Sequence, residues 1–398
     1  MKSLSIVSMG MGEDTMTTAA IRAVEDAQAL LGAPRMLAQF KRLNKPTFSV
    51  YAPGSVAQIL GNESYQRFAL LVSGDAGLHS AAEAIIQSFS GDTAMIEVFP
   101  GVSSLQYLFA KMRRPWQDIG IVSCHGRDGN LIDAVRRNPT TFALTGGNVA
   151  ALAGRMIDAG YGGLTATLGE NLGMASERVL TAPVSALPTM KIGALAVLAI
   201  DNPDFDARVR FGIADSEFVR GDVPMTKAEV RAVALAKLAL SPEAVCYDVG
   251  AGTGSVTVEM ALASYRGHVY AIDRSEEAIQ LVQQNCTTFH IGNVTPILGR
   301  APDALADLPK PDAVFIGGSG GNLGAIFDCV LKKNPHARIV VNAIALQSVN
   351  SALAAFTAHG IEPEMVQLSV SRGKAAGGMH MLTAMNPVFI ISGGGYGR

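Results

Sequence analysis

Short apolar runs separated by stretches with helical spacing recur along the second half of the chain. The predicted strands cover about residues 245–248, 268–273, 294–298, 313–316 and 338–342. Helices are predicted between them, at about 276–289 and 323–331. Because helices alternate with apolar strands, we expect right-handed βαβ crossovers and a parallel sheet. Two later runs, 365–371 and 387–392, are joined through Gly377-Gly378 and predict an antiparallel pair at one edge.

Three apolar strands in the first half end in small, polar loops. The loops are Ser8 to Asp14, Ser73-Gly-Asp75 and Pro100 to Ser104. A helix is predicted at about 17–31, and another is capped by Ser103 or Ser104. We expect the three loops at one edge of one sheet, where an α/β fold usually has its ligand crevice. A second small sheet is predicted from strands at 119–123, 141–145, 164–168 and 194–200.

The stretch 245–259 carries the strongest functional signal. Its apolar run ends at Asp248 and opens into three alternating glycines, Gly250, Gly252 and Gly254, before a helix. Glycine permits positive φ in such a turn and lets a ligand approach the backbone. The next strand ends at Asp273, where open α/β sheets place a carboxylate for ribose hydroxyls. A strand-to-helix turn without a ligand is the alternative.

The glycine spacing bears on the choice of ligand. Dinucleotide sites use G-x-G-x-x-G, whereas this chain has G-x-G-x-G with an acid two residues ahead, which resembles S-adenosylmethionine (SAM)-dependent methyltransferases. SAM carries a sulfonium and no pyrophosphate, so it needs no helix N-terminus reserved for phosphate. We therefore expect SAM at this turn.

Length and composition set limits on domain number and location. A chain of 398 residues predicts two or three domains. We interpret it as a domain over 1–205, a linker over 206–222 and a domain over 223–398. The apolar content is 48%, yet no apolar run is long enough to span a membrane, and residues near the N-terminus form no targeting signal. A cytoplasmic protein is expected.

Charge and cysteine usage exclude other classes of function. The net charge of −2 and the lack of a Lys/Arg run argue against nucleic acid as a partner. The four cysteines contain no C-x-x-C pair, and the histidines have no ligand-like spacing, so we expect neither a disulfide framework nor a metal site. An anionic substrate must then meet a local basic patch.

Both halves of the chain resemble known families. Residues Phe218-Val-Arg220, Pro224-Met-Thr-Lys227, 248–254 and Asn386-Pro-Val-Phe389 closely resemble the decarboxylating precorrin (C15)-methyltransferases. The first half resembles the tetrapyrrole methylases, specifically precorrin (C5)-methyltransferase. Its matching segments are Gly10-Met-Gly12, Ser73-Gly-Asp75, Pro100 to Ser104, His125-Gly-Arg127 and Glu170-Asn-Leu-Gly173. Relatives often have proline after Ser-Gly-Asp, where this chain has Ala76, which leaves the shape of that loop open.

The resemblance implies the fold and the reaction. It implies an α/β protein in which a two-subdomain tetrapyrrole methylase fold precedes a Rossmann-like class I SAM methyltransferase fold. It further implies methylation of precorrin-6B at C5 and C15 and decarboxylation of its C12 acetate to give precorrin-8X, in cobalamin biosynthesis. A homo-oligomer is expected from the low charge and the family likeness. Whether the substrate contains cobalt stays open.

The residues expected to carry this chemistry fall into three groups. In the second half we assign SAM to Asp248, Gly250, Gly252, Gly254, Asp273, Arg300 and Ala301. In the first half we assign a second SAM to Gly10, Gly12, Gly74, Asp75 and Ser103. The alternative role for Asp75 is to cap a helix. Substrate carboxylates are assigned to Arg220, Thr226, Lys227, Arg372 and Lys374, and the catalytic candidates are Lys227, Arg231, His125 and Arg127. Thr226 and Glu229 are also expected to form a capping box for a helix that extends to about residue 240.

Two alternative functions stay open. One is a tandem methyltransferase that acts on another substrate such as RNA, which the absent basic surface disfavours. The other is a chain whose first half is a noncatalytic binding or assembly module. In every version the proton donor for decarboxylation is unassigned, and an in-line methyl transfer depends mainly on positioning.

Overall fold

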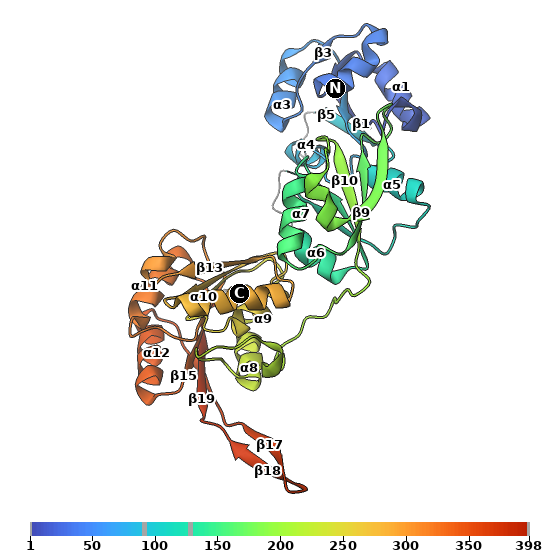
Figure 1. Ribbon diagram of the computed structural model, residues 1–398. Helices are drawn as coiled ribbons and strands as arrows, with labels where there is room; N and C mark the ends of the chain where they lie inside the picture. The colour runs from blue at the N-terminus through green and yellow to red at the C-terminus, as the bar shows by residue number, and fades with distance from the viewer. Residues whose placement is uncertain (1, 90–93, 126–129, 396–398) are drawn as a thin grey trace. The chain divides into compact units, whose positions relative to one another are not determined.

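The computed structural model describes residues 2–89, 94–125 and 130–395 (Figure 1). Contacts between Cα atoms divide the chain into two compact units. The first unit comprises Met1–Asp128, Pro139–Leu152 and Leu164–Asp201, and the second comprises Gly129–Asn138, Ala153–Gly163 and Asn202–Arg398. No helix among the described residues is both long and apolar enough to cross a membrane.

The first unit begins with a parallel five-stranded sheet in the order β3-β2-β4-β1-β5. The strands are β1 (Lys2–Ser8), β2 (Ala29–Leu31), β3 (Thr47–Phe48), β4 (Arg67–Val72) and β5 (Ala94–Phe99). The helices are α1 (Thr18–Asp26), α2 (Pro34–Leu37), α3 (Pro53–Asn62) and α4 (Ala82–Ser88), with 3-10 turns η1 (Glu13–Thr15) and η2 (Ala38–Leu43). Leu4, Ile6 and Leu70 pack on one face of the sheet, while Val7 and Leu71 pack on the other.

One predicted element of this sheet was wrong. The helix expected at 17–31 ends at Asp26, and the last three residues of that range form the fully buried strand β2. A buried apolar run this short has no periodicity that separates strand from helix, so only its pairing with β4 decides its structure. The other prediction is confirmed, because β1, β4 and β5 are adjacent and parallel.

A second five-stranded sheet follows, in the order β6-β7-β10-β8-β9. Its strands are β6 (Gly120–Ser123), β7 (Thr140–Leu144), β8 (Thr165–Glu170), β9 (Arg178–Pro183) and β10 (Ala196–Asp201). The helices of this stretch of the chain are α5 (Ser104–Met112), α6 (Leu131–Arg137), α7 (Val149–Asp158) and the 3-10 helix η3 (Val184–Thr189). Four of these strands were predicted; β9 was missed because it is a largely exposed edge strand without an apolar run.

The second unit contains a seven-stranded sheet in the order β13-β12-β11-β14-β15-β19-β16. Its strands are β11 (Val245–Val249), β12 (His268–Asp273), β13 (Val294–Leu298), β14 (Ala313–Ile316), β15 (Arg338–Ala343), β16 (Glu364–Leu368) and β19 (Val388–Gly393). The first five strands are parallel, and β19 pairs antiparallel with β15 and β16. The order reverses between β11 and β14, which is the switch point where such sheets bind ligands.

Helices cover both faces of this sheet. One core cluster joins α8 (Ala228–Leu238) and α9 (Ser255–Ala263) to Cys246, Phe315 and Val340. The opposite face packs against α11 (Leu323–Lys333) and α12 (Leu346–Ala358) through Val314 and Ile339. The remaining elements are α10 (Glu276–Thr288), η4 (Asp215–Glu217) and η5 (Asp303–Leu305). The predicted strands and helices of this half are confirmed, while α12 was not anticipated.

A separate two-stranded hairpin, β17 (Ser371–Ala376) and β18 (Met379–Ala384), extends away from the sheet (Figure 1). Gly377 and Gly378 form its turn and both have positive φ, as two-residue hairpin turns require. The edge pair predicted from 365–371 and 387–392 is confirmed as β16 and β19. The glycines, however, do not link that pair directly, because the hairpin lies between its strands.

Candidate cofactor and substrate sites

The glycine turn after β11 lies at the carboxyl edge of the sheet, at its switch point. Gly250, Gly252 and Gly254 all have positive φ. A Cβ on Gly250 would lie 2.7 Å from the backbone nitrogen of Gly318, and one on Gly252 would lie 2.6 Å from the carbonyl oxygen of Pro224. These two glycines are therefore also required by the packing of the protein's own backbone, a reason that the sequence pattern did not reveal.

Asp248, the last acid before this turn, is completely buried. The hydroxyl of Thr257 on α9 donates a hydrogen bond to Oδ2, while Oδ1 has no partner among the described residues. Burial raises the pKa of Asp248 to about 7; the Thr257 bond lowers it, and the nearby Asp273 raises it. An unpaired buried acceptor costs about 1–3 kcal/mol, so a ligand that donates a hydrogen bond here would be stabilised.

Asp273 ends the neighbouring strand β12 and faces the same turn. Its Oδ2 accepts a hydrogen bond from Gly252 N at 3.0 Å, and its Oδ1 accepts one from Ser275 N at 3.0 Å. Leu298 on β13 lies in register with Asp273, which brings Arg300 and Ala301 to the same edge. Arg300 is exposed, and Ala301 packs against the core. The structure thus brings together all the residues assigned to SAM in this half.

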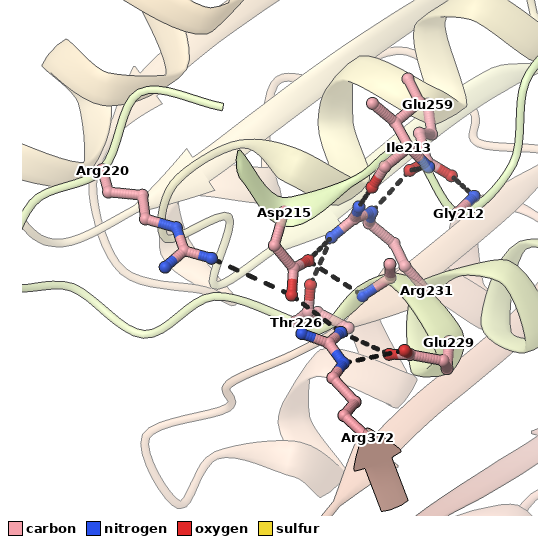
Figure 2. Close-up of polar contacts among 10 residues, drawn as sticks. Gly212, Ile213, Asp215, Arg220, Thr226, Glu229, Arg231, Glu259 and Arg372 are labelled. Carbon is pink, nitrogen blue, oxygen red and sulfur yellow. Dashed lines mark hydrogen bonds and ion pairs between the residues drawn. The ribbon is translucent and has the colours of Figure 1, made fainter. Parts of the chain in front are cut away.

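Arg231 is a structural residue and not a catalytic one, which corrects the sequence-based assignment. Its side chain is 0% exposed. Nε donates to Glu259, Nη1 donates to Asp215 and to the Thr226 carbonyl, and Nη2 donates to the Ile213 carbonyl (Figure 2). With its donors held in this way, Arg231 cannot reach a substrate.

Asp215 is the centre of the surrounding ion-pair network, which sequence reasoning missed. Its carboxylate contacts Arg231 at 3.3 Å, Arg372 at 3.0 Å and Arg220 at 3.9 Å (Figure 2). Burial raises its pKa, but the bonds to Arg372 and Arg231 outweigh burial and hold the pKa below its usual value. Asp215 lies in the segment predicted to be a linker, where an isolated acid gave no signal.

Asp215 also binds the first turn of α8, where the sequence predicted a cap from Thr226. Thr226 makes no side-chain cap; instead, Oδ1 of Asp215 accepts a hydrogen bond from Ala228 N at 3.0 Å. Glu229 does not form a capping box, because its carboxylate binds Arg372. Lys227 occupies the N-cap position and is partly buried, and Lys374 is exposed on β17, two residues beyond Arg372.

A pocket of about 650 Å³ lies beside this network. It is lined by Gly212, Ala214, Asp215, Ser216, Phe218, Arg220, Ala228, Glu229 and Arg372. Two of the five residues assigned to substrate carboxylates, Arg220 and Arg372, therefore line one pocket. Both are paired with acids, so the expected patch is not simply basic.

In the first unit, the loops after β1 and β4 are bound to each other through their backbones. Gly10 N donates to the Gly74 carbonyl at 3.0 Å, and Gly74 N donates to the Gly10 carbonyl at 3.1 Å. Asp75 does not cap a helix: its oxygens accept hydrogen bonds from Gly77 N and Gly101 N. It therefore ties the β4 loop to the β5 loop.

The remaining residues of this half lie around the same loops. Ser103 caps α5 in a capping box with Gln106, which resolves the choice between Ser103 and Ser104. Gly173 approaches the loop that contains Gly12 so closely that a Cβ would lie 2.1 Å from the Met11 carbonyl oxygen. Two segments that carried the resemblance are thus in contact.

Ala76, where the resemblance led us to expect proline, is held by a hydrogen bond from its backbone. Its N–H donates a hydrogen bond to Ser8 Oγ at 2.9 Å, a bond that proline could not make. His125 follows β6, is exposed and lies beside Gly146. Arg127 lies outside the described residues. The described part of the chain contains no group of three His, Cys, Asp or Glu side chains placed to hold a metal ion.

Comparisons with known proteins match each half separately. Residues 3–188 match the tetrapyrrole (corrin/porphyrin) methylases, and residues 217–393 match the precorrin methyltransferase domain. A probable cobalt-precorrin-6B C(15)-methyltransferase (decarboxylating) from Pyrobaculum calidifontis is 44% identical over 46% of this chain and 94% of its own length. The Salmonella typhimurium cobalt-precorrin-6B C(15)-methyltransferase (decarboxylating) is 41% identical over 45% of this chain and 93% of its own.

A solved structure from Geobacter metallireducens, described as precorrin-6y C5,15-methyltransferase, is 37% identical over 46% of this chain and 97% of its own, with a TM-score of 0.45. The expected fold class is confirmed, with a tetrapyrrole methylase fold followed by a Rossmann-like methyltransferase domain. Through its second half the chain belongs to the decarboxylating precorrin-6B C(15)-methyltransferase family, and it carries a tetrapyrrole methylase domain ahead of that half.

Proposed function

We propose that this chain is a bifunctional, SAM-dependent precorrin-6B C5,15-methyltransferase of cobalamin biosynthesis. The first half methylates C5; the second methylates C15 and decarboxylates the C12 acetate, which yields precorrin-8X. The observation that carries the proposal is the unpaired Oδ1 of buried Asp248 beside the glycine turn, within a domain of the decarboxylating family.

We assign one SAM site to each half. In the second half, Asp248 offers an acceptor to the donor groups of SAM, and Asp273 is placed for the ribose hydroxyls at the carboxyl edge of the sheet. In the first half, we assign SAM to the loops that contain Gly10 and Gly74, which are hydrogen-bonded to each other through their backbones. Asp75 joins the second of these loops to the β5 loop. SAM supplies an activated methyl group when it is bound.

The protein's own contribution is to hold the two reactants in line. Methyl transfer from an activated donor to an electron-rich carbon gains mostly from orientation, and no strong nucleophilic side chain is required. Cys246 supports this account, because burial raises its pKa to about 12 and keeps the thiol protonated near neutral pH. For decarboxylation, the pocket residues Arg220 and Arg372 orient a carboxylate. As the bond to the departing carbon dioxide breaks, the conjugated macrocycle accepts the electron pair, and the remaining carbon then takes up a proton, whose donor is unassigned.

Mass spectrometry of metal-free precorrin-6B incubated with SAM and the full-length chain tests the proposal. The expected product has gained two methyl groups and lost one carbon dioxide. At limiting SAM, the full-length Asp273→Ala variant should still add the C5 methyl but add the C15 methyl much more slowly than wild type. A wild-type product with a single methyl would make one half a noncatalytic module, and a substrate left unchanged in both its metal-free and its cobalt form would contradict the function.

We further propose that the chain forms a homo-oligomer and that the β17–β18 hairpin takes part in the contact between copies. The hairpin presents Met379, Met381 and Leu382, whose exposed fractions are 69%, 60% and 77%. A two-stranded ribbon with such side chains in water is only marginally stable by itself, so contact with another copy would stabilise it.

A further inference from the structure

The pocket lined by Asp215 and the ion-pair network behind it together contain equal numbers of positive and negative side chains. Three arginines, Arg220, Arg231 and Arg372, are linked by ion pairs to Asp215, Glu229 and Glu259 (Figure 2). An anionic substrate arm would therefore meet a neutral network. For Arg372 to bind a substrate carboxylate, one of its two acidic partners must leave it.

Two of these acids, Glu259 and Asp215, cannot leave their arginine partners at low cost. Glu259 and the Arg231 that it contacts are both fully buried, and Glu259 also accepts hydrogen bonds from Gly212 N and Ile213 N. Asp215 is 6% exposed and holds Arg231, Arg372 and the first turn of α8. Removing one partner of a buried pair costs about 3–5 kcal/mol.

Glu229 differs from both acids. Its side chain is 43% exposed, and among the described residues its carboxylate is paired with Arg372 alone. The contact is bidentate, at 2.9 Å to Oε1 and 2.6 Å to Oε2, which is the geometry that a free carboxylate would adopt on this arginine. The two side chains of the pair are 41% and 43% exposed, so solvent screens it, and a substrate carboxylate that makes the same bidentate contact with Arg372 can replace Glu229.

We propose that Glu229 occupies a carboxylate subsite of the pocket and is displaced when a carboxylate arm of the tetrapyrrole binds Arg372, with Arg220 beside it. This inference rests on the proposed function, because that function supplies a substrate with such arms. Once Glu229 has left, the network has one net positive charge, which matches one carboxylate. Asp215 keeps Arg372 in place throughout the exchange.

The subsite is connected to the cofactor turn by a short segment. Residues 224–227 run from the Pro224 carbonyl, which closely approaches Gly252, to the first turn of α8, where Glu229 lies. Arg372 is on β17 and Glu229 is on α8. Loss of the contact between them therefore also removes a direct link between the hairpin and that helix. Glu229 thereby influences both substrate affinity and the attachment of the hairpin.

A titration of the full-length chain with uroporphyrin tests the exchange without turnover. Uroporphyrin is a stable macrocycle with acetate and propionate arms, and its own fluorescence reports binding. The Glu229→Gln variant removes the competing charge, so its dissociation constant should fall about fivefold at low salt, with less effect at high salt. The control is Glu364→Gln, which breaks the exposed pair with Lys237 elsewhere in the unit and should leave the constant unchanged.

A second variant shows whether the effect acts through Arg372. Arg372→Gln should weaken uroporphyrin binding about tenfold, and adding Glu229→Gln to it should then change nothing further. Binding by Glu229→Gln that is equal to or weaker than wild type, with an unaltered unfolding temperature, would overturn the proposal. So would a complete lack of uroporphyrin binding by both chains. Failure to methylate precorrin-6B would instead contradict the proposed function.

Discussion

Asp248 is a carboxylic acid that the fold buries with only one of its oxygens satisfied. In the unfolded chain it ionises near 3.8, whereas burial raises the pKa in the folded chain to about 7. A raised pKa means that the folded state retains a proton that the unfolded state releases. Asp248 therefore favours folding at low pH, and this contribution is lost as the pH rises through about 7.

Asp248→Asn should remove this pH dependence, because an amide stays neutral. Without SAM, the variant should be more stable than wild type by roughly 4 kcal/mol at pH 8 and about equal to it near pH 4. Unfolding temperatures measured from pH 4 to pH 8 check the difference between the two chains. A difference that does not change with pH would show that Asp248 is ionised throughout. The variant should also bind SAM more weakly.

Asp273 is the residue-scale test of the cofactor assignment in the second half. Asp273→Ala removes the acceptor proposed for two ribose hydroxyls and also the bond to Gly252 N, so SAM affinity in that half should fall at least about tenfold. Calorimetry should find one weakened site and one unaltered site. Asp328→Ala is the control, since its carboxylate contacts His359 on the helical layer. Two unaltered sites in Asp273→Ala would refute the ribose assignment.

At the scale of elements, the start of α8 depends on a residue far back in the chain. The sequence pattern predicted a local cap from Thr226, but Asp215 caps the helix and also neutralises buried Arg231. Ile213 and Phe218 on either side of Asp215 pack against Val258 and Leu262, so these positions of the predicted linker belong to the packed domain, although most of the segment is exposed.

Two substitutions separate the distant cap from the local one. Asp215→Ala leaves buried Arg231 without one of its two acidic partners and should destabilise the second unit by about 3 kcal/mol or more. Thr226→Ala keeps the backbone carbonyl that Arg231 uses, so it should cost less than about 0.5 kcal/mol. Denaturant unfolding of the full-length chain measures both. A larger loss of unfolding free energy in Thr226→Ala than in Asp215→Ala would show that Thr226, and not Asp215, caps the helix.

At the scale of the whole molecule, the β17–β18 hairpin is the clearest candidate for contact between copies. Met381→Glu together with Leu382→Glu places charge on the exposed ribbon and should shift the protein toward monomer in light scattering coupled to size exclusion. Lys332→Glu, on α11 in the helical layer, is the matched control and should leave the mass unchanged. An unchanged mass in the double variant would exclude the hairpin from the contact.

The sequence by itself determined the parts of this protein that depend on local pattern. Apolar runs that end at Asp248 and Asp273 identified buried parallel strands, and the spacing of Gly250, Gly252 and Gly254 indicated a turn with positive φ. These features follow from the alternation of strand and helix and from the conformational freedom of glycine. They were sufficient to locate the candidate cofactor edge, whereas the order of the two folds followed from the resemblance of each half to a known family.

Only the tertiary structure decided which charged residues a substrate can reach. Arg231, Arg220 and Arg372 look alike in the sequence, yet Arg231 is fully buried and bonded, while the other two line a pocket. Their partners Asp215 and Glu259 lie 16 and 28 residues from Arg231, so no local spacing predicts the pairing. Whether a charge is desolvated depends on packing between distant segments, and that packing determines which arginines can meet a substrate.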